Sequence, residues 1–211
     1  PACPAMPNAA WRADGTGWDP KGPASLHHAR AALDASGRVV AYEFFAKGFS
    51  RQHIATNESK AADSLIGQAL GIPSKPTWIF GAPVESYAFD NKLLAWETIA
   101  PLADNYSPLR TAHLRDPVGP ELHFASESFM DELAAAAGED PVAFRLKYLS
   151  NPRHAAVVKA VAEKANWKPR TSPSKDGKGR GLAFAERNGT SVAAVAEVEV
   201  DRATGRVWAR R

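Results

Sequence analysis

The chain has 211 residues, of which 45% are hydrophobic, so it is long enough to form one large or two small domains with a packed core. Its 26 basic and 23 acidic residues are mostly interspersed and give a formal net charge of +3, which is not the basic field of a nucleic-acid-binding protein. No apolar run reaches the length of about 18 residues that predicts a membrane span, and residues 1–10 do not have the pattern of a signal peptide. The single Cys3 excludes a disulfide framework within the chain and cannot by itself form a zinc or iron–sulfur site.

Two short runs, residues 26–34 and 38–46, are separated by an Ala-Ser-Gly turn. A turn of small residues between two such runs is typical of a β-hairpin, so we expect two antiparallel strands. His27 and His28 are adjacent on the first strand. Their side chains should therefore point to opposite faces and cannot bind one metal ion together.

The segment 48–110 is long, irregular and rich in proline. Within it, residues 59–70 have the pattern of a helix that ends at Gly71, and residues 77–80 have that of a short buried strand. Long loops in a compact domain are usually functional or are covered by another polypeptide. We expect one of these two roles for this segment.

Three helices are predicted in the second half of the chain. The first has apolar residues at helical spacing from residue 124 and ends at Gly138, which suits the left-handed position after a helix. Asp140 and Pro141 are an N-cap and a first helical residue for the second helix, which stops at the next Asn-Pro pair. The third helix is expected from residue 153 to about residue 166. Its predicted buried stripe consists of Ala156, Val157, Ala160, Val161 and Ala165.

The C-terminal part begins with a basic run, residues 168–180, which we interpret as a solvated loop in preference to a nucleic-acid or membrane site. A structural β-hairpin is predicted after it, with strands at residues 191–200 and 206–210. Glu197 and Glu199 should share its solvent face, because they are two residues apart on one strand.

Residues 124–149 read FASESFMDELAAAAGEDPVAFRLKYL. This string resembles the pattern FAxESFxDELAxxAGxDPxxFRxxxL of the molybdenum hydroxylase large subunits, a family that includes xanthine dehydrogenases and aldehyde oxidases. Residues 17–24, 179–184 and 193–205 also agree with the family in order and spacing. The wording is most similar to that of the isoquinoline 1-oxidoreductase beta subunits and their nicotinate-dehydrogenase-like relatives. The resemblance covers most of the chain from Trp11 onward.

The resemblance implies an α+β fold in which antiparallel β-hairpins pack with a helical layer, as part of the molybdopterin-binding region of the family. Five segments are expected on this basis. They are an irregular segment 1–16, a β-rich and loop-rich part 17–120 with a cofactor-facing loop, a helical segment 121–167, a basic loop 168–180 and a β-hairpin 181–211.

Residues 114–120 read LRDPVGP and fall where the family has a cofactor-facing loop of the form FRGFGGP. By the resemblance, Arg115 falls on the family's arginine near the molybdenum centre, and Leu114 and Gly119 are cofactor-binding positions beside it. A guanidinium near substrate and a backbone amide near an oxo ligand can both stabilise developing negative charge. The loop departs from the family at Asp116, whose carboxylate could neutralise Arg115. Arg115 is therefore either close to the cofactor or a loop anchor.

For the complete enzyme, the resemblance implies an oxidoreductase that hydroxylates N-heteroaromatic or aldehyde substrates with oxygen derived from water. The implied cofactors are molybdenum on molybdopterin cytosine dinucleotide, and iron–sulfur clusters on a partner subunit. The expected partners are the remaining parts of the large subunit, a small iron–sulfur subunit and a cytochrome electron acceptor. Neither nucleic acid nor direct membrane insertion is expected.

The Gly-Gly-Phe-Gly loop and the general-base glutamate of the family are not found in this sequence. We therefore expect an internal fragment of a larger subunit, inactive when isolated. The competing hypothesis is a non-catalytic binding or interaction module that retains the same scaffold. The compartment stays open between bacterial cytoplasm and periplasm.

Other titratable residues near the loop have ordinary interpretations. His113 and His123 flank Arg115, but neither has a spacing partner that would indicate a metal site. Glu121 and Glu127 are interpreted as charges at the start of a helix, where they favour the helix dipole, and not as paired catalytic carboxylates.

Overall fold

The structure, a computed structural model, describes residues 21–50, 70–72, 86–99, 111–112, 119–171 and 176–211. The chain divides into two compact units, the first made of residues 1–26, 47–81 and 96–119 and the second of residues 27–46, 82–95 and 120–211. The helix predicted at residues 59–70 lies outside the described residues except for Leu70, and so does the strand predicted at residues 77–80.

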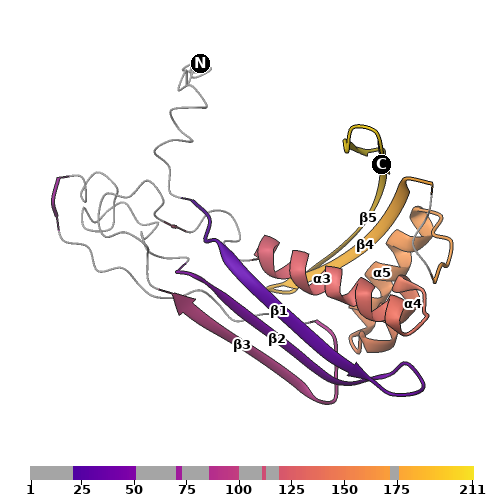
Figure 1. The fold of residues 1–211 in the computed structure, drawn as a ribbon. Coiled ribbons are helices and arrows are strands. Elements are labelled where there is room, and N and C mark those ends of the chain that lie inside the picture. Colours follow the sequence, from indigo (N-terminus) through magenta and orange to yellow (C-terminus); the bar gives the residue numbers. More distant parts are fainter. Residues whose placement is uncertain (1–20, 51–69, 73–85, 100–110, 113–118, 172–175) are drawn as a thin grey trace, which may run out of the picture. The chain divides into compact units, whose positions relative to one another are not determined.

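The first sheet contains β1 (Ser25–Leu33), β2 (Val39–Phe49) and β3 (Lys92–Ile99), in that spatial order. β1 and β2 form the predicted hairpin (Figure 1), and Gly37 in its turn has φ of 78°, a conformation that favours glycine. β3 was not predicted. β3 runs beside β2 in the same direction. Parallel strands cannot be joined by a tight turn, and the long segment between β2 and β3 provides the connection that such a pair requires.

Alternate side chains of the hairpin face the core of the second unit. On β1 the burial alternates along the whole strand, with His27 half-buried and His28 exposed, as expected from their opposite directions. His27 stacks on Phe44 of β2 at 5.7 Å between ring centroids. Tyr42 of β2 is 2% exposed and stacks on Phe89 at 4.5 Å. These rings form one side of the core.

In the first unit, the described residues are joined mainly by backbone contacts. Lys21 and Thr111 form an isolated parallel bridge, and the Ala112 N–H donates to the Lys21 carbonyl at 3.1 Å. The Thr111 hydroxyl donates to the carbonyl of Ser50, which is buried.

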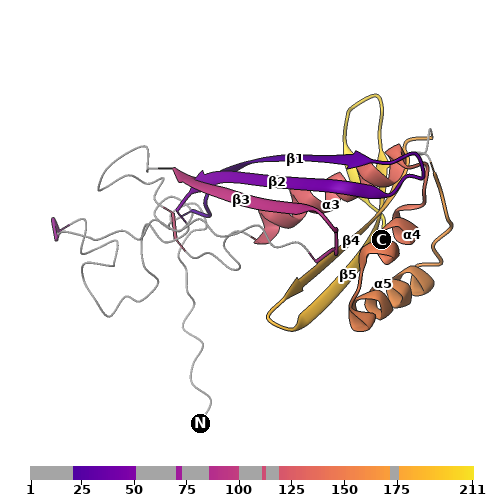
Figure 2. The same ribbon diagram turned by 90° about the horizontal axis from the view of Figure 1, so that it is seen from below.

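Helix α3 (Gly119–Ala136) lies between the two sheets of the structure (Figures 1 and 2). Its Phe129 contacts Tyr42 of the first sheet at 5.9 Å between ring centroids. The helix ends as predicted at Gly138, where φ is 68° and the Gly138 N–H donates to the Ala135 carbonyl. Its start lies earlier than the predicted residue 124, because the preceding Gly-Pro pair already forms the first turn.

Helices α4 (Pro141–Tyr148) and α5 (Pro152–Lys164) both begin with an N-cap followed by proline. The Asp140 carboxylate accepts from the N–H groups of the second and third residues after it, and Asn151 caps α5 through the N–H of Arg153. The predicted stripe of α5 is wrong in part, since Ala156 and Ala160 are exposed while Val158 is fully buried. Alanine and valine occupy neighbouring positions along α5, so the sequence pattern does not show which of two adjacent faces of the helix is buried.

The second sheet has the order β4 (Lys178–Arg187), β5 (Thr190–Val200) and β6 (Val207–Ala209), all antiparallel. The β5–β6 hairpin confirms the predicted one, and its turn is closed by the Asp201 carboxylate, which accepts hydrogen bonds from Thr204 and Ala203. Helix α5 covers one face of this sheet (Figure 2). With one mixed sheet, one antiparallel sheet and three helices among the described residues, the structure is compatible with the predicted α+β class.

Candidate functional site

The residues expected to face the cofactor are described only in part. Leu114 and Arg115 lie outside the described residues. Gly119 is described: it is buried and is the first residue of α3. The expected cofactor-facing loop therefore leads directly into an 18-residue helix, whose first N–H groups have no partner within the helix.

The first turn of α3 carries an acceptor that the described part of the chain leaves unsatisfied. Glu121 is the acidic residue of this turn, and its Oε2 atom is buried without a hydrogen bond from the described residues. A buried carboxylate oxygen of this kind accepts readily from N–H or O–H groups. His123, two residues further on, is half-buried, while His113 lies outside the described residues.

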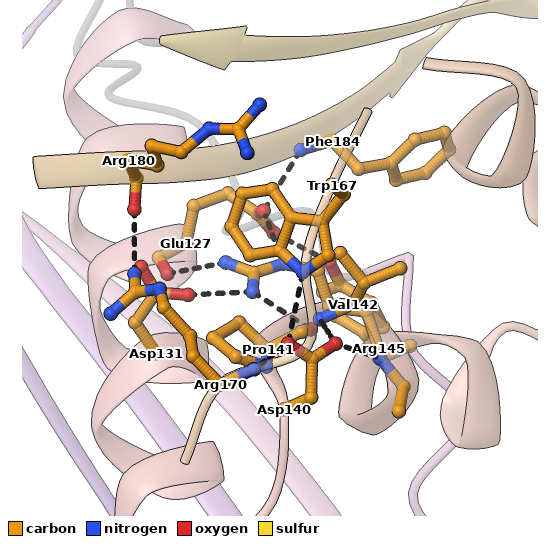
Figure 3. Close-up of polar contacts among 12 residues, drawn as sticks. Glu127, Asp131, Asp140, Pro141, Val142, Arg145, Trp167, Arg170, Arg180 and Phe184 are labelled. Atoms are coloured by element: carbon orange, nitrogen blue, oxygen red, sulfur yellow. Dashed lines mark hydrogen bonds and ion pairs between the residues drawn. The ribbon is translucent and has the colours of Figure 1, made fainter. Parts of the chain in front are cut away.

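Deeper in the second unit, Glu127 and Arg145 form a buried ion pair (Figure 3). The Arg145 Nε donates to Glu127 Oε2 at 2.9 Å, and the side chains are 0% and 7% exposed. Glu127 also accepts from the Tyr87 hydroxyl at 2.7 Å and from the backbone N–H of Phe184 at 2.8 Å. One carboxylate thus joins α3, α4 and β4 within this unit.

The Arg145 side chain donates four hydrogen bonds to described acceptors. Besides the Glu127 side chain, it donates to Asp131 Oδ1 at 2.6 Å, to the Glu127 carbonyl at 2.9 Å and to the Pro141 carbonyl at 3.2 Å. Burial opposes its charged form, but the carboxylates of Glu127 and Asp131 outweigh burial and raise the pKa of Arg145 above its ordinary value. Arg145 is therefore a permanent buried cation held by two carboxylates.

This cluster corrects the interpretation of Glu127 as a charge at the start of a helix. Glu127 lies two turns inside α3, because α3 begins at Gly119, and its carboxylate points into the core. Sequence reasoning also missed Arg145. Its position between the buried Phe144 and Tyr148 of α4 was the available signal, since an arginine on the apolar side of a helix requires a buried acid nearby.

A second polar cluster surrounds Trp167 and includes two arginines of the basic run, Arg170 and Arg180, which we expected to be solvated. The guanidinium groups of Arg170 and Arg180 lie 5.7 Å and 5.5 Å from the centre of the Trp167 ring (Figure 3). The Trp167 indole N–H and the Arg170 backbone N–H both donate to Asp140 Oδ2 at 2.9 Å. Arg180 also pairs with Glu197 at 2.9 Å. These two arginines are thus part of the fold.

Neither cluster has the composition of a metal centre. No group of three or more His, Cys, Asp or Glu side chains that could bind a metal ion occurs in the described ranges. Among the described residues, no helix is long and apolar enough to cross a membrane. We take the start of α3 as the candidate site, because the expected cofactor-facing loop leads into it and Glu121 Oε2 has no partner among the described residues. The Glu127–Arg145 cluster joins this helix to α4.

Comparison with known proteins gives clear relatives. No family model matches the chain. The chain is 35% identical to a nicotinate dehydrogenase subunit of Pseudomonas putida over 208 residues, which are 92% of this chain and 17% of that protein. It is 40% identical to the beta subunit of isoquinoline 1-oxidoreductase from Brevundimonas diminuta over 94 residues, covering 42% of this chain and 12% of that protein. A third relative, from Gluconacetobacter polyoxogenes, is named a membrane-bound aldehyde dehydrogenase that uses pyrroloquinoline quinone. It is 32% identical over 102 residues, which are 40% of this chain and 13% of that protein.

A solved structure, the aldehyde oxidoreductase of Desulfovibrio gigas, is similar over 87% of this chain and 20% of its own, with 19% identity and a TM-score of 0.41. The sequence matches, together with the string carried by α3 and α4, show that the chain belongs to the molybdenum hydroxylase family. The chain spans 17% and 12% of the length of the first two relatives, and both are named as one subunit of an enzyme.

Proposed function

We propose that the chain forms part of the molybdopterin-binding large subunit of an oxidoreductase. In this proposal the complete enzyme hydroxylates N-heteroaromatic or aldehyde substrates with oxygen derived from water. The observation that supports it most is the 35% identity over 92% of the chain to a nicotinate dehydrogenase subunit, a protein whose name specifies an N-heteroaromatic substrate. Aldehydes are the alternative class, named in the third relative.

The described residues at the start of α3 are compatible with a bound molybdopterin dinucleotide. Glu121 Oε2 is a buried acceptor without a partner among the described residues, and the pterin and ribose groups of such a cofactor present N–H and O–H donors. Gly119 has no side chain, so its backbone could approach a ligand closely. Leu114, Arg115 and Gly119 are the residues we propose to line the cofactor.

When bound, the cofactor supplies the redox chemistry, and the protein supplies binding, orientation and electrostatics. Arg115 would place a permanent positive charge where negative charge develops on the substrate. The Glu127–Arg145 pair would keep α3 fixed, because rotation of the helix would leave the buried Arg145 without its partner charge. We further propose the cytosine dinucleotide form of the cofactor, a small iron–sulfur partner subunit and a cytochrome as electron acceptor.

The test uses the full-length subunit purified with its partner. We expect about stoichiometric molybdenum, an iron–sulfur absorption spectrum and oxidation of nicotinate-like or aldehyde substrates. A protein without molybdenum and without turnover would support the competing non-catalytic module. Extraction of pyrroloquinoline quinone in place of molybdenum would refute the proposed cofactor.

Arg115 is tested by its replacement with alanine in the same enzyme. We expect Arg115→Ala to lower kcat/KM about a hundredfold, as for the loss of one group that stabilises transition-state charge. Arg153→Ala, an exposed arginine on α5, is the matched control and should leave kcat/KM unchanged. If kcat/KM also stays unchanged in Arg115→Ala, Arg115 is a loop anchor, paired with Asp116 and not placed at the substrate.

A further inference from the structure

The outward face of the β4–β5 ribbon carries only glycine, alanine and valine side chains over its central part. We call this surface the alanine face. It is made of Gly181, Ala183, Ala185, Val192, Ala194 and Ala196.

Four of the six residues of the alanine face are exposed, and Gly181 and Ala185 are half-buried. Ala183 and Ala194 are directly opposite each other in the antiparallel register, and both are exposed, as is Ala196. Val192 is 57% exposed. In a sheet with one face in water, the side chains on that face are normally polar. An exposed apolar face of this kind therefore indicates a contact surface.

Apart from Arg187 at the end of β4, the charged side chains of the ribbon lie on its other face. Arg180 is opposite Glu197 in the register and forms an ion pair with it on the side where Leu182 and Phe184 are buried. The packed face thus carries both buried apolar side chains and an ion pair. Leu182 and Phe184 on this face pack into the fold, whereas the alanine face has no contact with another described helix or strand that a hydrogen bond or ion pair marks.

The alanine face is also shaped for close approach. It has no side chain larger than valine, and a Cβ atom added at Gly181 would meet no atom within 4 Å. Small residues let the backbone of a neighbouring layer come near, and Gly in a strand interior is typical where another backbone approaches. Such a face buries little apolar area for each residue that it contributes.

We propose that the alanine face is the docking surface for a further apolar layer of the same large subunit, an uncharged helix or sheet outside these 211 residues. This rests on the proposed function, in which the activity belongs to a larger subunit. The matched stretch is only 17% of the length of the nicotinate dehydrogenase relative, so most of that polypeptide is available to cover the face.

The small buried area favours this occupant over a second copy of the chain. Association of two separate molecules costs about 4–15 kcal/mol of translational and rotational freedom. A layer on the same polypeptide has a high effective concentration and avoids most of that cost. A face of glycine, alanine and one valine buries too little apolar area to offset the cost of association between separate molecules.

The test compares the same variants in two forms of the protein, this 211-residue chain and the full-length subunit. Ala194→Glu places a charge on the alanine face, and Gly181→Val adds bulk without a charge. Ala160→Glu on the exposed side of α5 is the control. In the 211-residue chain, we expect all three to leave the Tm within about 2 °C of the wild type, because the sites are open.

In the full-length subunit, we expect Ala194→Glu and Gly181→Val to lower the Tm by at least about 6 °C, while Ala160→Glu does not. Equal Tm changes of each variant in both forms would overturn the proposal. A 211-residue chain that sediments as a dimer, and becomes monomeric with Ala194→Glu, would replace it with the second copy. If Ala194→Glu fails to fold, Gly181→Val decides alone.

The proposed function is judged separately, from the molybdenum content and turnover of the wild-type subunit. Destabilisation limited to the full-length form in a protein without molybdenum would keep the docking surface and refute the activity. A functional molybdenum enzyme that tolerates both alanine-face variants would keep the proposed activity and refute the docking surface.

Discussion

Replacement of Arg145 by methionine should destabilise the protein strongly, because Arg145 is the only cation that contacts Glu127 among the described residues. Methionine keeps the length and apolar character of the side chain but removes four hydrogen bonds, two of them to backbone carbonyls. Glu127, 7% exposed, would keep its bonds from Tyr87 and Phe184 but would have no compensating charge.

Removal of one partner of a buried ion pair typically costs about 3–5 kcal/mol of unfolding free energy. For a chain of this size, that loss corresponds to a Tm lower by about 6–20 °C, since each kcal/mol shifts the Tm by about 2–4 °C. Urea unfolding followed by far-ultraviolet circular dichroism measures the free energy, and thermal unfolding measures the Tm. Lys147→Met on the same helix is the control, because its ion pair with Glu139 is exposed and contributes about 0.5 kcal/mol or less.

A double-mutant cycle separates the unpaired charge from the loss of packing. Glu127→Gln removes the charge and keeps an acceptor, so the double variant with Arg145→Met should be more stable than Arg145→Met alone. We expect a coupling energy of about 1–3 kcal/mol between the two sites. The reasoning is refuted if Arg145→Met loses less than about 1 kcal/mol, or if the double variant is no more stable than the single one.

Two further predictions concern the same unit. Burial against Phe44 lowers the pKa of His27 from its ordinary value of 6.5, so the unfolded chain binds a proton first and stability should decrease as the pH falls below 6.5. The pH dependence of the Tm between about pH 5 and 8 should therefore weaken in His27→Leu. It should persist in the control His28→Leu, because His28 is exposed. Equal slopes of Tm against pH in the two variants would contradict this. Asp140→Ala should cost about 2–4 kcal/mol in urea unfolding, since it removes a helix N-cap and two further hydrogen bonds. Asn151→Ala removes a cap and one exposed contact with His154, and should cost about 1 kcal/mol. Similar losses in the two variants would show that the extra bonds of Asp140 contribute nothing.

Local signals were sufficient where neighbouring residues along the chain determine the structure. The hairpin turn at Gly37, the end of α3 at Gly138 and the caps at Asp140 and Asn151 follow from backbone conformation and from side chains that bond their own segment. The first three were predicted from the sequence, because each depends on contacts within about four residues, whereas Asn151 was predicted only as the end of the second helix.

Contacts between distant segments were not available to the same reasoning. β3 has no alternation of its own and becomes a strand because β2 lies beside it. The exposed side of α5 at Ala156 and Ala160 was misassigned, because the packing of α5 on β5 selects the face. For the candidate site, the sequence indicated Gly119 by resemblance, but the burial of Glu121 Oε2 required the folded helix.

The sequence alone indicated the family, since the string in residues 124–149 resembles the family pattern in residue types and spacing. It also determined most of the helix ends, since capping is local. Only the tertiary structure decided what that string does. Glu127 and Arg145, which are 18 residues apart in this string, form a buried ion pair in the core. No local rule brings two such charges together, because the low dielectric that makes their pairing necessary exists only once the surrounding layers have packed.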